Sequence, residues 1–287
     1  MSSQIPAQLP SDSSTILERS RGVFFAQWEE LLRLRRAVLK TADPDDIHDL
    51  RVASRRFRAL LELFGPITPK ASKTGLKKNI RALTQVLGGL RNIDEALHFF
   101  ESQIQASTDI QHAFSQQRSK ELKLISKALE AFDFRSLDKT VRKMIAGLTA
   151  DCLKELNRFS LLSYFSDVSI RQSLPIHNLL AVSTSPENYS SRHALRIAIK
   201  KWRYFLEIVA QVLDRNYTPV LEMLKEYQSV LGRMNDIIEF RALLGNLELP
   251  VEDQKSLKAI LLTEDALLLE NFKALMERKP LVYAFSI

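Results

Sequence analysis

Two stretches of this 287-residue chain repeat the same order of residue types. The first is IHDLRVASRRFRALLEL, residues 47–63, and the second is RHALRIAIKKWRYFLEI, residues 192–208. His193 follows His48 by 145 positions, and most of the neighbouring residues match at the same offset. A second match, LGGLRNIDE from Leu87 and LGRMNDIIE from Leu231, has an offset of 144. Two ordered matches at nearly one offset predict an internal duplication, in which each copy is a unit of roughly four helices.

Each repeated stretch separates into two faces when it is advanced by about 100° per residue, as in an α-helix. One face is apolar and is predicted to pack against the core. Its members are Leu50, Ala53, Phe57, Leu60, Leu61 and Phe64 in the first copy, and Leu195, Ala198, Trp202, Phe205, Leu206 and Val209 in the second. The other face is cationic and is expected to carry no aromatic side chain.

The cationic faces predict a site for a chain of phosphates. They contain His48, Arg51, Arg55 and Arg58 in the first copy, and His193, Arg196, Lys200 and Arg203 in the second. At a rise of about 1.5 Å per residue, each row is about 15 Å long and can reach several phosphates. Arginine binds phosphate oxygens bidentately, and lysine acts as a point charge. A single such face is often only a solvated surface, but its recurrence in both copies favours a function. Glu62 and Glu207 are expected to orient Arg58 and Arg203 as i,i+4 partners.

Helical periodicity runs through the whole sequence, so the predicted fold class is all-α. Residues 1–14 are expected to form a disordered tail, followed by one domain over residues 15–287. That domain divides into repeat one, about 15–131, and repeat two, about 136–275. Residues 163–189, rich in Ser, Pro and Asn, are the predicted linker. The expected helices cover about 15–40, 44–64, 70–107, 111–131 and 136–162, and three more begin near 190, 218 and 251, with a short one possible at 176–182.

The composition limits the classes of function. Apolar residues make up 45% of the chain, which is enough for a sizeable core. The net charge of +7 and the sequence pI of about 9.4 point to an anionic partner. The single cysteine, Cys152, excludes an intramolecular disulfide. The sequence contains neither a signal-peptide pattern nor an apolar run long enough for a membrane span, so we expect a cytoplasmic protein without a membrane partner.

The repeated motifs resemble those of the CHAD domain, the conserved histidine α-helical domain. The pattern His-x-Leu-Arg-[Val/Ile]-x-x-[Arg/Lys]-[Arg/Lys]-x-Arg occurs in both copies, and the resemblance covers about residues 15–274. It implies two four-helix bundles related by pseudo-twofold symmetry around a basic central groove or pore. It also implies non-catalytic binding of inorganic polyphosphate, with targeting to polyphosphate granules or a role in organising them. One departure is Asn92, where the family has Asp; the second copy keeps Asp236.

The basic positions of the family transfer to both copies of this sequence. The implied polyphosphate-binding residues are His48, Arg51, Arg55, Arg56, Arg58, His193, Arg196, Lys200, Lys201 and Arg203. Further basic residues that could extend the site are Arg33, Arg36, Lys40, Lys73, Lys77, Arg81 and Arg91. Granule proteins are possible additional partners.

We expect no catalytic residue, metal or cofactor. The dipeptide His48-Asp49 resembles the start of a metal-dependent phosphohydrolase motif, but His48 is the first histidine of the chain, and the second copy has His193-Ala194. The sequence also lacks a Walker-type loop, HExxH and Gly-x-Ser-x-Gly. Binding to the backbone of RNA or DNA is the alternative function, since basic helices attract nucleic-acid phosphates in the same way. The expected lack of aromatic residues on the cationic faces argues against base stacking.

Overall fold

The structure, a computed structural model, describes residues 13–68, 73–103, 108–149, 161–247 and 249–281. Within these residues the chain is helical and contains no strand, which confirms the predicted all-α class. The α-helices are α1 (Ser13–Thr41), α2 (Pro44–Phe64), α3 (Lys73–Gln103), α4 (Thr108–Glu130), α5 (Phe134–Ala146), α7 (Leu161–Leu180), α8 (Tyr189–Leu213), α9 (Thr218–Gly245) and α10 (Val251–Arg278). Short 3-10 helices, η1 (Gly65–Ile67) and η3 (Ala181–Thr184), follow α2 and α7.

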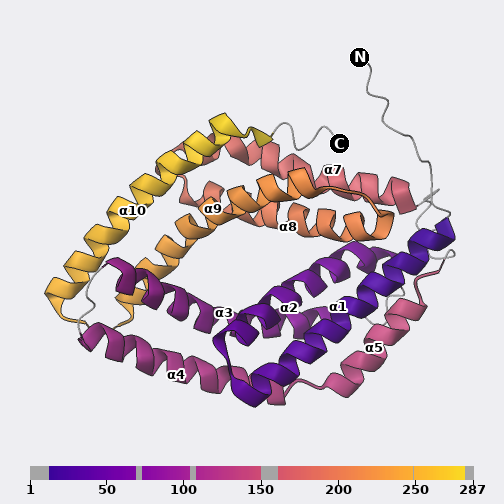
Figure 1. The fold of residues 1–287 in the computed structure, drawn as a ribbon, viewed down its shortest axis with the longest axis horizontal. Coiled ribbons are helices and arrows are strands. Elements are labelled where there is room, and N and C mark those ends of the chain that lie inside the picture. The colour runs from indigo at the N-terminus through magenta and orange to yellow at the C-terminus, as the bar shows by residue number, and fades with distance from the viewer. Residues whose placement is uncertain (1–12, 69–72, 104–107, 150–160, 248, 282–287) are drawn as a thin grey trace.

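The helices form two series with the same order of neighbours. In the first series α1 packs on α2, α2 on α3 and α3 on α4; in the second, α7 packs on α8, α8 on α9 and α9 on α10. Figure 1 shows the first series in the lower part of the molecule and the second series in the upper part. This order is the one that the duplication requires, while the pseudo-twofold symmetry stays a prediction.

The start of α2 shows how the sequence sets the orientation of the first cationic helix. The side chain of Asp43 accepts hydrogen bonds from the backbone N–H groups of Asp45, at 2.9 Å, and Asp46, at 3.4 Å. Pro44 occupies the first turn, where its missing N–H costs nothing. The negative charges of Asp45 and Asp46 interact favourably with the positive end of the helix dipole. Asp43 therefore caps α2, which packs on α1 after a short connection.

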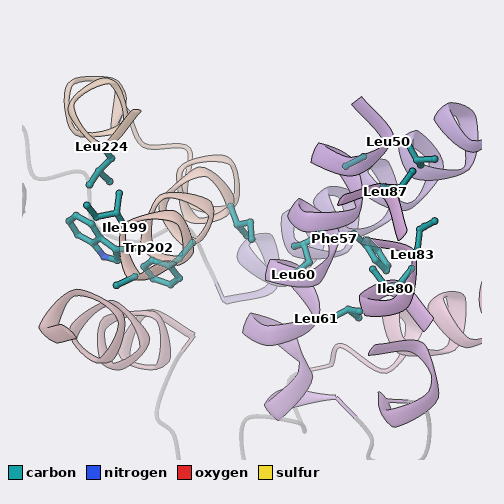
Figure 2. Close-up of a cluster of buried hydrophobic side chains, with 14 of the residues drawn as sticks. Leu50, Phe57, Leu60, Leu61, Ile80, Leu83, Leu87, Ile199, Trp202 and Leu224 are labelled. Carbon is teal, nitrogen blue, oxygen red and sulfur yellow. The ribbon is translucent and has the colours of Figure 1, made fainter. Parts of the chain in front are cut away.

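Aromatic side chains fill the core of the first series. Phe57 of α2 lies between Phe24 and Trp28 of α1, with ring centroids 5.4 Å and 5.1 Å away. Figure 2 shows Phe57 near Leu83 of α3, and, in the second series, Trp202 near Ile199 and Leu224. The two predicted apolar faces are buried at every position named above. Burial of these faces turns the opposite, cationic faces of α2 and α8 away from the core.

The two series contact each other through α1 and α8, α2 and α8, and α3 and α9. The ring of Phe240 in α9 lies 5.6 Å from that of Phe99 and 6.0 Å from that of Phe100, both in α3. Elsewhere Arg19 of α1 pairs with Asp214, the residue that ends α8, at 3.2 Å. These contacts fix the position of α8 relative to α2.

The predicted linker over residues 163–189 is wrong, because most of it forms α7 and η3. α7 buries Tyr164, Phe165, Val168 and Ile176, which recur on one side of a helix that packs on α8. The hydroxyl of Tyr164 also donates a hydrogen bond of 2.6 Å to the carbonyl oxygen of Leu63. The Ser and Pro residues that suggested a linker lie mainly at more exposed positions of this helix, and Pro175 is accommodated within it.

Other element boundaries differ in smaller ways from the expectations. α1 begins at Ser13, two residues before the helix expected from about residue 15. The rest of the expected tail, residues 1–12, lies outside the described residues, so the tail stays a prediction. The helix expected over 136–162 is α5, which ends at Ala146 and packs on α1, so the second repeat predicted from 136 includes a helix of the first half. Cys152 lies outside the described residues. No helix among those described is long and apolar enough to cross a membrane.

Candidate functional site

The cationic faces of α2 and α8 meet at a cleft, here called the central cleft. It has a volume of about 720 Å³ and is bounded by α2, α3, α8 and α9. Its basic lining residues are His48, Arg51, Arg55, Arg56, Arg91, Arg196, Lys200, Arg203, Lys225 and Arg233. Positive side chains from both series therefore converge on one space, and do not spread over opposite surfaces.

A second, smaller cavity lies between α2, α7 and α8 and is here called the side cavity. Its volume is about 270 Å³, and Arg58, Lys201 and Gln172 are among its lining residues. The central cleft and the side cavity share four lining residues: Arg55, Arg196, Lys200 and Tyr204. The two spaces are therefore neighbours across these four side chains. That the two spaces form one continuous pore stays a prediction.

Several cations of the central cleft form no ion pair with a described residue. Arg51, Arg55, Arg196 and Lys200 form no ion pair within the described part of the chain. The side chain of Lys200 is among the few charged groups that are buried, at 8% exposure. The Nε atoms of Arg51, Arg58, Arg196 and Arg203 are also buried and have no hydrogen-bond partner. Buried cationic donors without partners are costly, and a multivalent anion would satisfy them.

The electrostatic effect of this crowding is visible in the arginine pKa values. Burial, followed by the neighbouring charges of Arg55, Arg91 and Arg196, lowers the pKa of Arg51 to about 10. Burial is also the main cause that lowers the pKa of Arg55 and of Arg196. The site disfavours its own positive charge in the free protein, and the opposite charge of a bound anion would offset this cost.

A glycine of the second repeated motif lies beside the first arginine of each cationic row, and in the first copy it makes room for that arginine. A Cβ atom at Gly88 in α3 would lie 2.9 Å from Nη1 of Arg51, which instead donates a 2.9 Å hydrogen bond to the carbonyl oxygen of Thr84. At the corresponding Gly232 in α9, a Cβ atom would lie 4.0 Å from Nε of Arg196. The helices with these glycines, α3 and α9, pack on the helices with the cationic rows, α2 and α8. The two repeated motifs are therefore parts of one site.

Carboxylates at the edge of the cleft hold some of the cations in place. Glu207 lies 3.1 Å from Nη1 of Arg203, one turn away, and 3.5 Å from Nε of Arg56 in α2. Glu62 lies 4.0 Å from Nη2 of Arg58. The i,i+4 partners expected for Arg58 and Arg203 are confirmed. Glu207 does more than expected, because it joins the two series across the cleft.

Asp236 and Asn92, which occupy the same position of the second repeated motif, have different partners. Asp236 in α9 lies 3.9 Å from Nη1 of Arg91 in α3. Burial raises the pKa of Asp236, while Arg91 and Arg196 act against that shift. Asn92 donates a 3.3 Å hydrogen bond to Glu239 instead. In these contacts both residues join α3 to α9.

Not every predicted residue lines one of the two spaces. His193 is exposed, and its Nδ1 lies 2.6 Å from Oδ1 of Asn235, so its imidazole is directed toward α9. Of the possible additional residues, Arg91 lines the central cleft. The remaining described ones line neither space: Arg33, Arg36, Lys40, Lys77 and Arg81. Arg33 pairs with Glu30 at 2.7 Å on the exposed side of α1. The side chain of Lys73 lies outside the described part.

The sequence analysis missed several lining residues. Lys225, Gln228, Ser229 and Arg233 form the α9 wall of the central cleft and recur every three or four positions. A helical projection of the segment before and after Gly232 would have shown this stripe. Tyr204 corrects the expectation that the cationic faces lack aromatic residues, since it lines both spaces. It lies eleven positions after His193, about three helical turns, and thus near the cationic side.

The described residues contain no group of three His, Cys, Asp or Glu side chains that could hold a metal ion. The predicted absence of metal, cofactor and catalytic residues stays a prediction, since the complete chain is longer than its described part.

The geometry defines an all-helical protein with an unsatisfied cationic cleft between two helical series. A family model for the CHAD domain matches residues 22–245, and the chain therefore belongs to the CHAD domain family. A comparison with curated protein sequences found no match.

Two solved structures share the fold. One is the crystal structure of the CHAD domain from the plant Ricinus communis, with a TM-score of 0.71, 22% identity and 91% of each chain covered. The other is PptA from Streptomyces chartreusis, with a TM-score of 0.64 and 14% identity, covering 94% of this chain and 99% of that one. At these identities the likeness concerns the fold.

Proposed function

We propose that this protein binds inorganic polyphosphate in the central cleft and does not catalyse a reaction on it. The observation that carries the proposal is the convergence of Arg51, Arg55, Arg196 and Lys200 on one space, where none of them forms an ion pair with a described residue. Polyphosphate supplies a negative charge and several acceptor oxygens at every unit, which suits a row of donors at helical spacing. Membership of the CHAD domain family supports the same ligand.

The electrostatics of the cleft favour a linear polyanion over a single phosphate. Basic residues from α2, α3, α8 and α9 surround the space, so one phosphate could contact only a few of them. A chain of phosphates can satisfy many at once, and each cation that it contacts releases condensed counterions. We expect submicromolar affinity for long chains, which weakens steeply with added salt.

Nucleic acid is the alternative polyanion. The cleft supports it less well, because its one aromatic lining residue, Tyr204, is only 7% exposed and lies 5.0 Å from the guanidinium of Arg203. This tyrosine offers little open ring surface on which a base could stack. Trp202 and Phe57 are buried in the core, as predicted.

The test is a titration of the protein with long-chain polyphosphate at physiological salt. The double variant Arg55→Ala with Lys200→Ala should lose most of the affinity. Its matched control is Lys123→Ala with Lys127→Ala, which removes the same charge from exposed positions of α4 that line neither space. Equal affinities for the two double variants would refute the site.

A competition separates the two polyanions. Polyphosphate and single-stranded RNA of equal phosphate count are titrated against each other, and we expect polyphosphate to displace the RNA. The reverse order would favour the nucleic-acid alternative. Absence of catalysis is tested separately, by incubation with polyphosphate and divalent cations and measurement of released phosphate.

The cellular part of the proposal is a cytoplasmic location on polyphosphate granules, where the protein would be targeted by the polymer or would organise it. Fluorescent fusions of the wild type and of the Arg55→Ala, Lys200→Ala variant test this in cells that form granules. We expect granule staining only with the wild type.

A further inference from the structure

Tyr204 occupies the position at which the central cleft and the side cavity meet. It is one of the four residues that line both, and the other three are the cations Arg55, Arg196 and Lys200. Its side chain belongs to α8, one residue after Arg203. An uncharged residue at the centre of a cationic site requires an explanation, because the remaining shared positions are all positively charged.

The phenol hydroxyl of Tyr204 is free to bind a ligand. It has no hydrogen-bond partner among the described residues, and it is not one of the fully buried unpartnered atoms, so it stays accessible from the cavities. Burial lowers the pKa of Arg51, Arg55 and Arg196, and Tyr204 acts against this shift on all three, which places it close to each. Most buried tyrosine hydroxyls have a partner.

The ring of Tyr204 is not required to hold Arg203. The guanidinium of Arg203 lies 5.0 Å from the ring centroid, but Glu207 already binds it at 3.1 Å. The repeated helix also does not require tyrosine at this position, because the equivalent residue of the first copy, 145 positions earlier, is Ala59. Tyrosine at this position therefore adds one hydroxyl in the second copy only.

We propose that Tyr204 is a ligand-contacting residue whose hydroxyl donates a hydrogen bond to a phosphate oxygen at the junction of the central cleft and the side cavity. This inference rests on the proposed function. A neutral donor suits the position, because a further cation beside Arg55, Arg196 and Lys200 would add repulsion within a buried cluster. A phenol hydroxyl can donate one hydrogen bond, and a phosphate chain offers almost only acceptors.

The predicted contact has a signature that separates it from the contacts of the cations. Loss of a cation–phosphate contact weakens binding and lowers the slope of log affinity against log salt by about one, because one counterion fewer is released. Loss of a neutral hydroxyl weakens binding but releases no counterion. Substitution of Tyr204 should therefore change the affinity and leave the slope of log affinity against log salt unchanged.

The experiment measures long-chain polyphosphate affinity over a series of salt concentrations for the full-length protein. We expect Tyr204→Phe to bind about tenfold more weakly than wild type, as for loss of a hydrogen bond to a charged group, with the same salt slope. Arg203→Met should instead lower the slope by about one. Tyr217→Phe is the matched control, since Tyr217 lines a separate cavity beside α7, and we expect wild-type binding.

Thermal unfolding of each variant shows that it is folded, and Tyr204→Phe keeps the ring and its packing. Unchanged affinity of Tyr204→Phe would overturn the inference, and so would a weaker affinity with a shallower salt slope, because the tyrosine would then act by positioning a cation. A wild-type protein that does not bind polyphosphate would overturn the proposed function itself. The two failures are therefore distinguishable.

Discussion

A methyl group at Gly88 would lie 2.9 Å from Nη1 of Arg51, whereas a methyl group at the equivalent Gly232 would lie 4.0 Å from Nε of Arg196. Both glycines are inside helices, where alanine is more favourable by about 1 kcal/mol. We expect Gly88→Ala to displace the guanidinium from the carbonyl oxygen of Thr84 and to weaken polyphosphate binding.

Gly232→Ala is the control for this variant. We expect it to raise the midpoint of thermal unfolding and to leave affinity unchanged, since 4.0 Å is an ordinary contact distance. Equal affinity of the two variants in a titration would show that the position of Arg51 does not matter for the ligand.

Glu207 restrains two cations that the ligand needs. Replacement by Gln removes the charge that binds Arg203 and Arg56 and also removes a carboxylate that repels phosphate. We expect Glu207→Gln to increase affinity about two- to fivefold, in line with ~0.5–1 kcal/mol for a partly exposed pair. Glu62→Gln should have a smaller effect, because Glu62 pairs only with Arg58 at 4.0 Å. Weaker binding by Glu207→Gln would mean that Glu207 positions the cations for the ligand.

Lys200 and its neighbour Lys201 form a natural pair for comparison. Lys200 is 8% exposed and has no ion pair among the described residues, whereas Lys201 is exposed. Methionine keeps the length of the side chain and removes its charge, so Lys200→Met should stabilise the free protein by about 1 kcal/mol and lower the affinity about tenfold. Lys201→Met should change stability little. Urea unfolding and titration measure the two effects, and a destabilised Lys200→Met variant with normal affinity would contradict both expectations.

The depressed pKa of Arg51 predicts a dependence of stability on pH. Burial, followed by the charges of Arg55, Arg91 and Arg196, lowers this pKa to about 10, well below its ordinary value, so the unfolded chain binds the proton more tightly. Arg51 therefore destabilises the free protein at neutral pH, and this effect decreases as the pH rises through about 10.

The comparison is made between wild type and Arg51→Gln, which keeps a donor for Thr84. We expect the stability advantage of the variant, measured by urea unfolding, to be largest near pH 7 and smaller at pH 10.5. A difference that is constant over this range would show that the charge of Arg51 carries no cost. Bound polyphosphate should reduce the difference at every pH, because it supplies the missing negative charge.

The helix period of the sequence was sufficient to predict α2 and α8 and their two faces. Every predicted core position on them is buried, including Phe57 and Trp202. The helices that begin at Pro44, Thr218 and Val251 start where the sequence predicted them to start. This part of the fold was predictable because each signal depends on residues close together in the chain.

The features that were missed depend on contacts between distant segments. The Ser and Pro residues of α7 indicate a linker when the sequence is read alone, whereas its apolar positions pack on α8 in the structure. The role of Gly88 was not visible, because it depends on the approach of Arg51 from another helix. The repeated motif alone does not show that His193 contacts Asn235 of α9 and does not line the cleft with the other cations.

The packing of Phe99 and Phe100 against Phe240 has a consequence for the energetics of binding. These rings join α3 and α9 in the free protein, so the like charges on the two sides of the cleft are brought together when the chain folds. The repulsion is then already present before a ligand arrives. Association would release this stored free energy without a closing motion, and the polymer could enter a receptor that is already assembled.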